Sequence, residues 1–270
     1  AREYVKAVFE TSSDLRVGRG ERGPLNHAMA SWHVTRASAQ GLPTLSGRLW
    51  NDPEVVRLRE ACANGGFLKG LNTGSLPRTL FAGYVAQDKF FLEAFARAYT
   101  LALAKLPPTD ARGAVEFAAL VRGVVDELKL HASYALSLGI DLKVVEPVAA
   151  TSAYVDFLSQ IATDEDVVSC AAAMVPCMRL YAHLGQQMAA ATVPPAETYK
   201  EWIDAYSDPG FESLAASLES LLDRYADTGM DDGDEARYAT LRGYYVRAME
   251  LELAFFEAWA PGAAGAKAEL

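Results

Sequence analysis

The sequence predicts an all-α protein that folds as a single multi-helix bundle. Hydrophobic residues make up 51% of the 270 positions, and in several long segments they recur at spacings of three and four. Gly and Pro are sparse inside those segments, and runs of β-branched residues are few. A chain of this length can bury one large core. We expect that core over residues 46–260, after an N-terminal extension (1–45) and before a flexible tail or linker (261–270).

The first half of the chain shows four helical segments. Two short ones flank the stretch Asn64-Gly65-Gly66, and a long amphipathic one is predicted over residues 78–105. Pro107 and Pro108 end it, and the next helix is predicted over residues 111–138 with Gly139 as its C-cap. The inward stripe of the long helix reads Tyr84, Asp88, Phe91, Phe95 and Ala98.

The second half predicts five more helices, each with a recognisable start. Thr151 or Ser152 is expected to cap a helix that ends near Ile161, and Asp164 or Asp166 to cap the one after it. Asp208-Pro209-Gly210 is typical of a turn. The remaining helices are predicted over 170–190, 199–206, 211–225 and 235–259.

Charge and cysteine content restrict the partners and the compartment. A formal charge of −10 argues against nucleic acid and anionic membranes as partners. No apolar stretch approaches the roughly 18 residues expected of a membrane span, and residues 1–45 lack the apolar core of a secretory signal. Three cysteines cannot all pair, so we expect no disulfide framework and a reducing compartment. Cytoplasmic localisation is predicted, with an organelle such as a plastid or mitochondrion as the alternative.

The segment 172–185 carries the strongest chemical signal. It places a thiol, Cys177, directly after Pro176 inside an apolar helical pattern, with Tyr181 one turn later on the same face. An unpaired cysteine is often mere core filling. The residues on two other predicted helices favour a reactive role instead.

Two carboxylates lie within apolar stripes. In the last helix Glu252 belongs to a stripe that otherwise contains Leu241, Tyr245, Ala248, Phe255 and Trp259, and Asp88 lies between Tyr84 and Phe91. Burying an unpaired ionised carboxylate costs several kcal/mol, so such a group is paired, protonated or functional. One inward acid usually pairs with an arginine, whereas two acids and a thiol together predict a polar site within the bundle.

Other residues admit structural and functional interpretations. Glu127 and His131 share a helix face and could bind a metal, but a hydrogen-bonded pair is the preferred interpretation. Tyr154 and Tyr206 fit either the core or the wall of a binding site. His183 is expected at the surface or an interface. No glycine-rich phosphate loop, paired Cys-x-x-Cys or nucleophile elbow occurs, so neither a metal nor a cofactor is predicted.

Six motifs occur in a fixed order over residues 84–256. They are residues 84–92, 126–131, Tyr154, 175–185, 199–206 and 252–256. Each is weak alone, but the ordered set resembles the TenA family, the thiaminase II group with a heme-oxygenase-like fold. The Pro-Cys motif resembles the Cys-containing branch. Met178 and Arg179, where bacterial members often carry aromatic residues, are more similar to plant-like members.

The resemblance implies a hydrolase of thiamin salvage. It implies release of 4-amino-5-hydroxymethyl-2-methylpyrimidine from its 5-aminomethyl analogue, and weakly from thiamin, by a homo-oligomer that is a dimer or tetramer. In plant-like members a similar domain can be joined to a phosphatase. Carried over by position, Cys177 is the nucleophile, Glu252 the acid/base and Tyr181 the residue that assists the thiol. The implied substrate-binding residues are Asp88, Tyr154, Phe91, Tyr206 and Phe255.

Two other functions stay open at the level of the sequence. One is a non-catalytic pyrimidine-binding or regulatory module on the same scaffold. The other is a metal-dependent oxidase that would use Glu127 and His131 as ligands.

Overall fold

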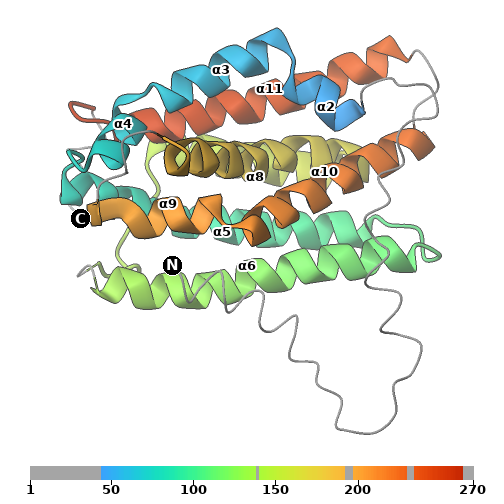
Figure 1. The fold of residues 1–270 in the computed structure, drawn as a ribbon. Helices are drawn as coiled ribbons and strands as arrows, with labels where there is room; N and C mark the ends of the chain where they lie inside the picture. The colour runs from blue at the N-terminus through green and yellow to red at the C-terminus, as the bar shows by residue number, and fades with distance from the viewer. Residues whose placement is uncertain (1–43, 138–139, 192–196, 230–233, 264–270) are drawn as a thin grey trace, which may run out of the picture.

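The computed structural model describes residues 44–137, 140–191, 197–229 and 234–263, with the side chains of 126–127, 129–134, 136–137, 197 and 228–229 excepted. Every regular element in these residues is a helix, which confirms the all-α prediction. The helices, in chain order, are α2 (Leu45–Trp50), α3 (Pro53–Ala63), α4 (Gly66–Thr73), α5 (Arg78–Ala104), α6 (Ala111–Ser137), α7 (Ala149–Asp164), α8 (Val167–Ala189), the 3₁₀ turn η2 (Glu197–Tyr199), α9 (Lys200–Ser207), α10 (Pro209–Gly229) and α11 (Glu235–Ala258) (Figure 1).

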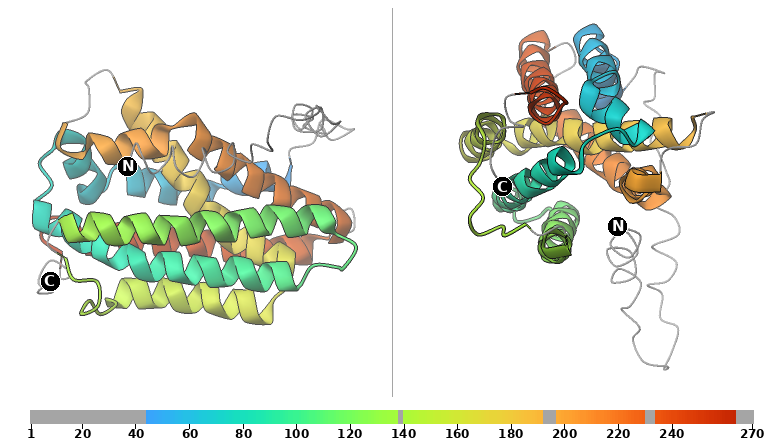
Figure 2. Two further views of the ribbon diagram at one scale, coloured as in Figure 1. Left: turned by 90° about the horizontal axis from the view of Figure 1, so that it is seen from below. Right: turned by 90° about the vertical axis from the view of Figure 1, so that its left-hand side faces the viewer.

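Helix α8 forms the centre of the bundle. It packs most extensively on α9, α10 and α11, and it also contacts α5 and α7. Helix α5 lies between α6 and α7, as the view from below shows (Figure 2), and α3 runs beside α11 (Figure 1). Helices α5, α7, α9, α10 and α11 therefore all pack against α8.

The central position of α8 corrects one expectation from the sequence. Contrary to that expectation, Val167–Ala189 is long and apolar enough to cross a membrane by length and composition. However, 83% of its most apolar window is buried inside the bundle, as in the core helix of a folded domain. The helix is therefore weak evidence for a membrane span.

Two predicted helix starts are confirmed. The side chain of Asp166 accepts a hydrogen bond from the backbone N–H of Ser169 at 2.9 Å and caps α8. Asp234 caps α11 in the same way through the N–H of Arg237, also at 2.9 Å. Short acidic side chains at these positions satisfy N–H groups that the helix itself leaves unpaired.

Two other predicted starts were wrong. Helix α7 begins at Ala149, so Thr151 lies fully buried within the helix instead of capping it. No side chain caps α7, and the backbone N–H of its N-cap residue Val148 donates to the side-chain oxygen of Gln87 on α5 at 3.0 Å, which ties the start of α7 to α5. The chain does bend at Asp208, as predicted, but helix α10 already starts at Pro209 and not at residue 211. Proline suits the first helical position, and Asp208 accepts a 2.7 Å hydrogen bond from the N–H of Gly210.

We expect Gly185→Ala to destabilise the fold. A Cβ at Gly185 on α8 would lie 2.4 Å from the backbone carbon of Tyr206 and 2.7 Å from the nitrogen of Ser207, so α9 must move. Overpacking of this kind costs about 1–3 kcal/mol of unfolding free energy, measured by urea denaturation. The matched control is Gly243→Ala on α11, where a Cβ meets nothing within 4 Å. It should gain about 0.5–1 kcal/mol from helix propensity. Equal stability of the two variants would contradict this packing.

Candidate active site

The three cysteines occupy different environments. All are buried and unpaired with one another, which confirms the absence of a disulfide framework. Cys170 donates to the carbonyl of Ile161 at 3.7 Å, and burial raises its pKa to about 11. Burial also raises the pKa of Cys62 well above its usual value. Of the three thiols, Cys177 is the one whose hydrogen bond lowers the pKa of a buried carboxyl group, that of Glu252.

The sequence of α8 explains why Cys177 faces the core. Cys177 and Tyr181 are four residues apart, so their side chains lie one above the other on the same face of the helix, and both are at least 90% buried. Pro176 lies within the helix immediately before the thiol. Because proline has no N–H, it cannot donate the helical hydrogen bond to the carbonyl of Ala172.

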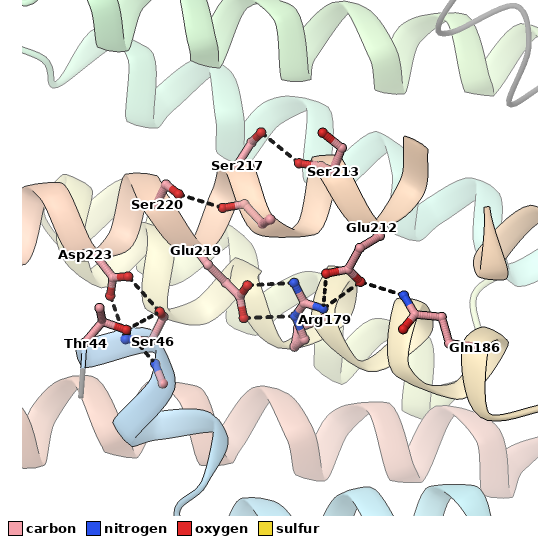
Figure 3. Close-up of polar contacts among 12 residues, drawn as sticks. Thr44, Ser46, Arg179, Gln186, Glu212, Ser213, Ser217, Glu219, Ser220 and Asp223 are labelled. Carbon is pink, nitrogen blue, oxygen red and sulfur yellow. Dashed lines mark hydrogen bonds and ion pairs between the residues drawn. The ribbon is translucent and has the colours of Figure 1, made fainter. Parts of the chain in front are cut away.

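Arg179 ties the opposite face of α8 to α10. Two residues correspond to about 200° around a helix, so its side chain points away from Cys177. Its guanidinium donates two hydrogen bonds to Glu219, at 2.9 and 2.7 Å, and two to Glu212, at 2.9 and 2.8 Å (Figure 3). Gln186 adds a 2.6 Å hydrogen bond to Glu212. Arg179 therefore fixes α8 against α10.

Glu252 is a buried carboxyl group on α11. It is 1% exposed, and its Oε1 accepts a 2.8 Å hydrogen bond from the hydroxyl of Tyr154 on α7. Its Oε2 makes no hydrogen bond of ordinary geometry with any described residue, although a weak hydrogen bond from the Cys177 thiol lowers the pKa. Burial has the largest effect and raises the pKa of Glu252 to about 8. The group is therefore mainly protonated at neutral pH.

Aromatic rings from three helices lie beside Glu252 and Tyr154. Phe91 lies edge-on to Tyr154, with ring centroids 4.6 Å apart, and 6.2 Å from Phe255. Phe255 in turn lies 5.4 Å from Tyr84. The predicted residues Phe91, Tyr154 and Phe255 thus come together from α5, α7 and α11 around Glu252.

Tyr181 belongs to a second group of rings. Its hydroxyl lies 2.9 Å from that of Tyr84 on α5, and its ring lies 4.8 Å from Tyr206 and 5.9 Å from Trp202 on α9. Phe255 touches Tyr84 and Phe91, so it joins the two groups into one site. Sequence reasoning named Tyr84 only as part of a stripe and missed Trp202, although Trp202 precedes Tyr206 by one helical turn.

Asp88 is less buried than its position in the apolar stripe suggested. The sequence placed it as a second inward acid, whereas the structure leaves its side chain partly exposed at the edge of the cluster. Its charge still raises the pKa values of Glu252, Tyr84 and Tyr181, so it lies near all three groups.

Of the four histidines, His183 is the one whose side chain the structure describes. The side chains of Glu127 and His131, and all of His27 and His33, lie outside the described residues. His183 is half-buried and packs edge-on to Trp50 at 5.6 Å. Within the described side chains, no group of three or more His, Cys, Asp or Glu residues is arranged to hold a metal ion.

Comparison with known proteins places this site in a family context. The chain is 32% identical to the mitochondrial bifunctional TH2 protein of Arabidopsis thaliana over 93% of its own length, but it spans only 42% of that relative. It is 31% identical to an aminopyrimidine aminohydrolase of Halalkalibacterium halodurans, covering 67% of this chain and 82% of the relative.

Solved structures show the same architecture. A protein from Silicibacter sp. TM1040 described as a TenA family transcription regulator superposes with a TM-score of 0.69 at 27% identity, covering 75% of this chain and 91% of that one. A TenA homologue from Pyrococcus furiosus gives a TM-score of 0.70 at 20% identity, covering 78% and 98%, which supports the shared fold. The TENA/THI-4/PQQC family model matches residues 53–260, and the chain therefore belongs to that family.

Proposed function

We propose that the chain is an aminopyrimidine aminohydrolase of the thiaminase II type that acts in thiamin salvage. The observation that carries the proposal is a fully buried carboxyl group, Glu252, which accepts a hydrogen bond from Tyr154 and lies beside the thiol of Cys177. The similarity to aminopyrimidine aminohydrolases, at 31% identity over most of one such enzyme, supports the same reaction. The substrate is the 5-aminomethyl analogue of 4-amino-5-hydroxymethyl-2-methylpyrimidine, with thiamin as a poorer substrate.

The residue types around Glu252 suit a flat, electron-poor heterocycle. Phe91, Phe255 and Tyr206 offer aromatic faces for stacking, which is favourable for a planar ring. Asp88, as a carboxylate, accepts hydrogen bonds from the exocyclic amino group of the pyrimidine. Tyr154 keeps the Glu252 carboxyl in one orientation, since its hydroxyl already occupies Oε1.

The first half of the reaction is addition and loss of the amine. Direct displacement of an amine from the exocyclic CH₂ is slow because the amine is a poor leaving group. In the proposed route, the sulfur of Cys177 bonds to a ring carbon adjacent to a ring nitrogen, and Glu252 gives its proton to that nitrogen. Electrons move toward the exocyclic CH₂, its C–N bond breaks, and the thiol proton leaves with the amine as ammonia. Glu252 is then a carboxylate.

The second half restores the enzyme. Water adds through its oxygen to the exocyclic CH₂, the C–S bond breaks, and the departing sulfur recovers a proton from that water. Glu252 takes its proton back from the ring nitrogen as the aromatic ring re-forms. The net change is exchange of an amino group for a hydroxyl, with no oxidant or reductant. A carboxyl pKa near 8 suits a group that must both give and regain a proton near neutral pH.

The deciding experiment is a turnover assay that compares the aminomethyl-pyrimidine with thiamin and follows ammonia and the hydroxymethyl product. We expect conversion of the aminomethyl compound and slower cleavage of thiamin. Saturable binding of the hydroxymethyl product with no conversion would instead support the pyrimidine-binding or regulatory module. Stoichiometric iron in protein purified without chelator would support the oxidase. One solved relative is described as a transcription regulator, but a net charge of −10 opposes direct contact with DNA.

The proposal extends to the oligomeric state, the parent chain and the compartment of the protein. We expect a homo-oligomer, since Leu101, Val115, Val125 and Val144 are large hydrophobic residues with at least 38% exposure. Light scattering that detects only a 29 kDa species would contradict this. The relatives named bifunctional and multifunctional support a phosphatase or other domain in a longer parent chain, and a mitochondrial relative makes an organelle as plausible a compartment as the cytoplasm.

A further inference from the structure

Tyr84 and Tyr181 form a hydrogen-bonded pair that the mechanism above does not use. Their hydroxyl oxygens lie 2.9 Å apart, although the two residues are separated by 97 positions and come from α5 and α8. Both side chains are almost fully buried, with 2% and 5% exposure. A buried hydroxyl without a hydrogen-bond partner is destabilising, so each hydroxyl restricts the orientation of the other.

Either hydroxyl of this pair can be the donor, and Trp202 lies beside it. Its ring lies 5.9 Å from Tyr181, and its indole Nε1 is buried with no hydrogen bond of ordinary geometry to the described residues. The indole is nevertheless close enough to the Tyr84 hydroxyl to lower the pKa of that group by hydrogen bonding. An indole N–H can only donate. When Tyr84 accepts from Trp202, its own hydrogen is available for the oxygen of Tyr181.

The hydrogen of Tyr181 then remains for a third group. Tyr181 follows Cys177 by one turn on the same face of α8, and the pKa of its hydroxyl responds to the charge of Cys177. A hydroxyl aimed at sulfur stabilises the thiolate over the thiol, because the hydrogen bond to an ionised acceptor is the stronger one.

We propose that Tyr84 is a positioning residue of this hydrolase: its hydroxyl, backed by the indole of Trp202, holds the Tyr181 hydroxyl so that Tyr181 donates to the sulfur of Cys177. The inference rests on the proposed function and adds two residues to it. Neither Tyr84 nor Trp202 needs to touch the substrate.

The test measures the ionisation of Cys177 directly. Alkylation by iodoacetamide is followed against pH with peptide mass spectrometry, which separates Cys177 from the fully buried Cys62 and Cys170. In Tyr84→Phe we expect the midpoint of Cys177 alkylation to rise by about one pH unit, as the loss of one hydrogen bond predicts. We expect kcat to fall about 10-fold with little change in KM. Trp202→Phe, which removes the indole N–H together with part of the ring, should shift both readouts in the same direction by a smaller amount.

Tyr245→Phe is the matched control. Tyr245 is also a fully buried tyrosine, but its hydroxyl has no hydrogen-bond partner among the described residues. Its removal should leave the alkylation midpoint and kcat unchanged. The double variant Tyr84→Phe/Tyr181→Phe should be no slower than Tyr181→Phe alone, because both changes remove one interaction.

An unchanged alkylation midpoint in Tyr84→Phe, or a loss of kcat that adds to that of Tyr181→Phe, overturns the inference. The alkylation profile needs no substrate. A wild-type protein without turnover would therefore refute the proposed hydrolase, while the effect of Tyr84 on the thiol would still be decided separately.

Discussion

Cys177→Ser is expected to lower kcat for the aminomethyl-pyrimidine by at least about 10³-fold while leaving the fold and pyrimidine binding intact. A serine hydroxyl has nearly the shape of the thiol but a far higher pKa, so it supplies almost no anionic nucleophile at neutral pH. Because the change lies in one atom of a buried side chain, the helical circular dichroism and the Kd for the hydroxymethyl product should stay close to wild type. Stopped assays of ammonia release give kcat, and calorimetry gives Kd.

The control for this variant is Cys170→Ser. Cys170 lies on the same helix, is also buried, and donates to the carbonyl of Ile161. We expect its kcat to remain within about threefold of wild type, because a hydroxyl can keep that hydrogen bond. An unaltered kcat in Cys177→Ser would end the covalent mechanism, whatever the control shows.

Glu252→Gln should lower kcat by about 10²–10⁴-fold, because an amide cannot deliver a proton to the ring nitrogen. The variant keeps the size of the side chain and the acceptor for the Tyr154 hydroxyl, so substrate binding should persist. Wild-type kcat should decline as pH rises through about 8, where Glu252 loses its proton. Glu250→Gln is the matched control. Glu250 lies on the same helix but pairs with Arg247 at the surface, so its loss should leave kcat unchanged.

The same substitution should also change how stability depends on pH. The pKa of Glu252 is about 8 in the folded protein against 4.5 for an ordinary glutamate side chain, so between these values the unfolded chain releases a proton that the folded chain keeps. Ionisation of Glu252 therefore favours the unfolded state. The stability that the protonated carboxyl contributes is fully present below pH 4.5 and is lost as the pH rises through 8. Relative to Glu252→Gln, wild type should lose up to about 5 kcal/mol of unfolding free energy over this window. Parallel pH profiles of the two proteins in urea would contradict a raised pKa.

The sequence predicted the helices well because helical periodicity is local information. The stripe through Tyr245, Glu252 and Trp259 is fully buried on α11, and α5 runs over almost the predicted residues. Caps were less predictable. The side chains of Asp166 and Asp234 accept hydrogen bonds from N–H groups three residues later in the chain. The start of α7, in contrast, is tied to Gln87, which is 61 residues away from Val148.

The site was predictable only in part, for the same reason. Spacing placed Cys177 beside Tyr181 on one helix and singled out Glu252, but it could not pair residues from different helices. The contacts of Tyr154 with Glu252 and of Tyr84 with Tyr181 join positions 98 and 97 apart. Asp88 was expected to be as buried as Glu252, yet it lies at the edge of the bundle, because a stripe gives the direction of a side chain and not its depth. The predicted roles of these residues, and the boundaries at 45 and 260, stay predictions.

The central claim is that Glu252 carries a proton at neutral pH beside the sulfur of Cys177. A ¹³C NMR titration of glutamate side-chain carboxyls, with Glu252→Gln to assign the signal, measures this directly. We predict one carboxyl that titrates near pH 8 and whose midpoint changes in Cys177→Ser. A Glu252 carboxyl that is already ionised at pH 5, or a titration midpoint that is the same in wild type and Cys177→Ser, would contradict the claim.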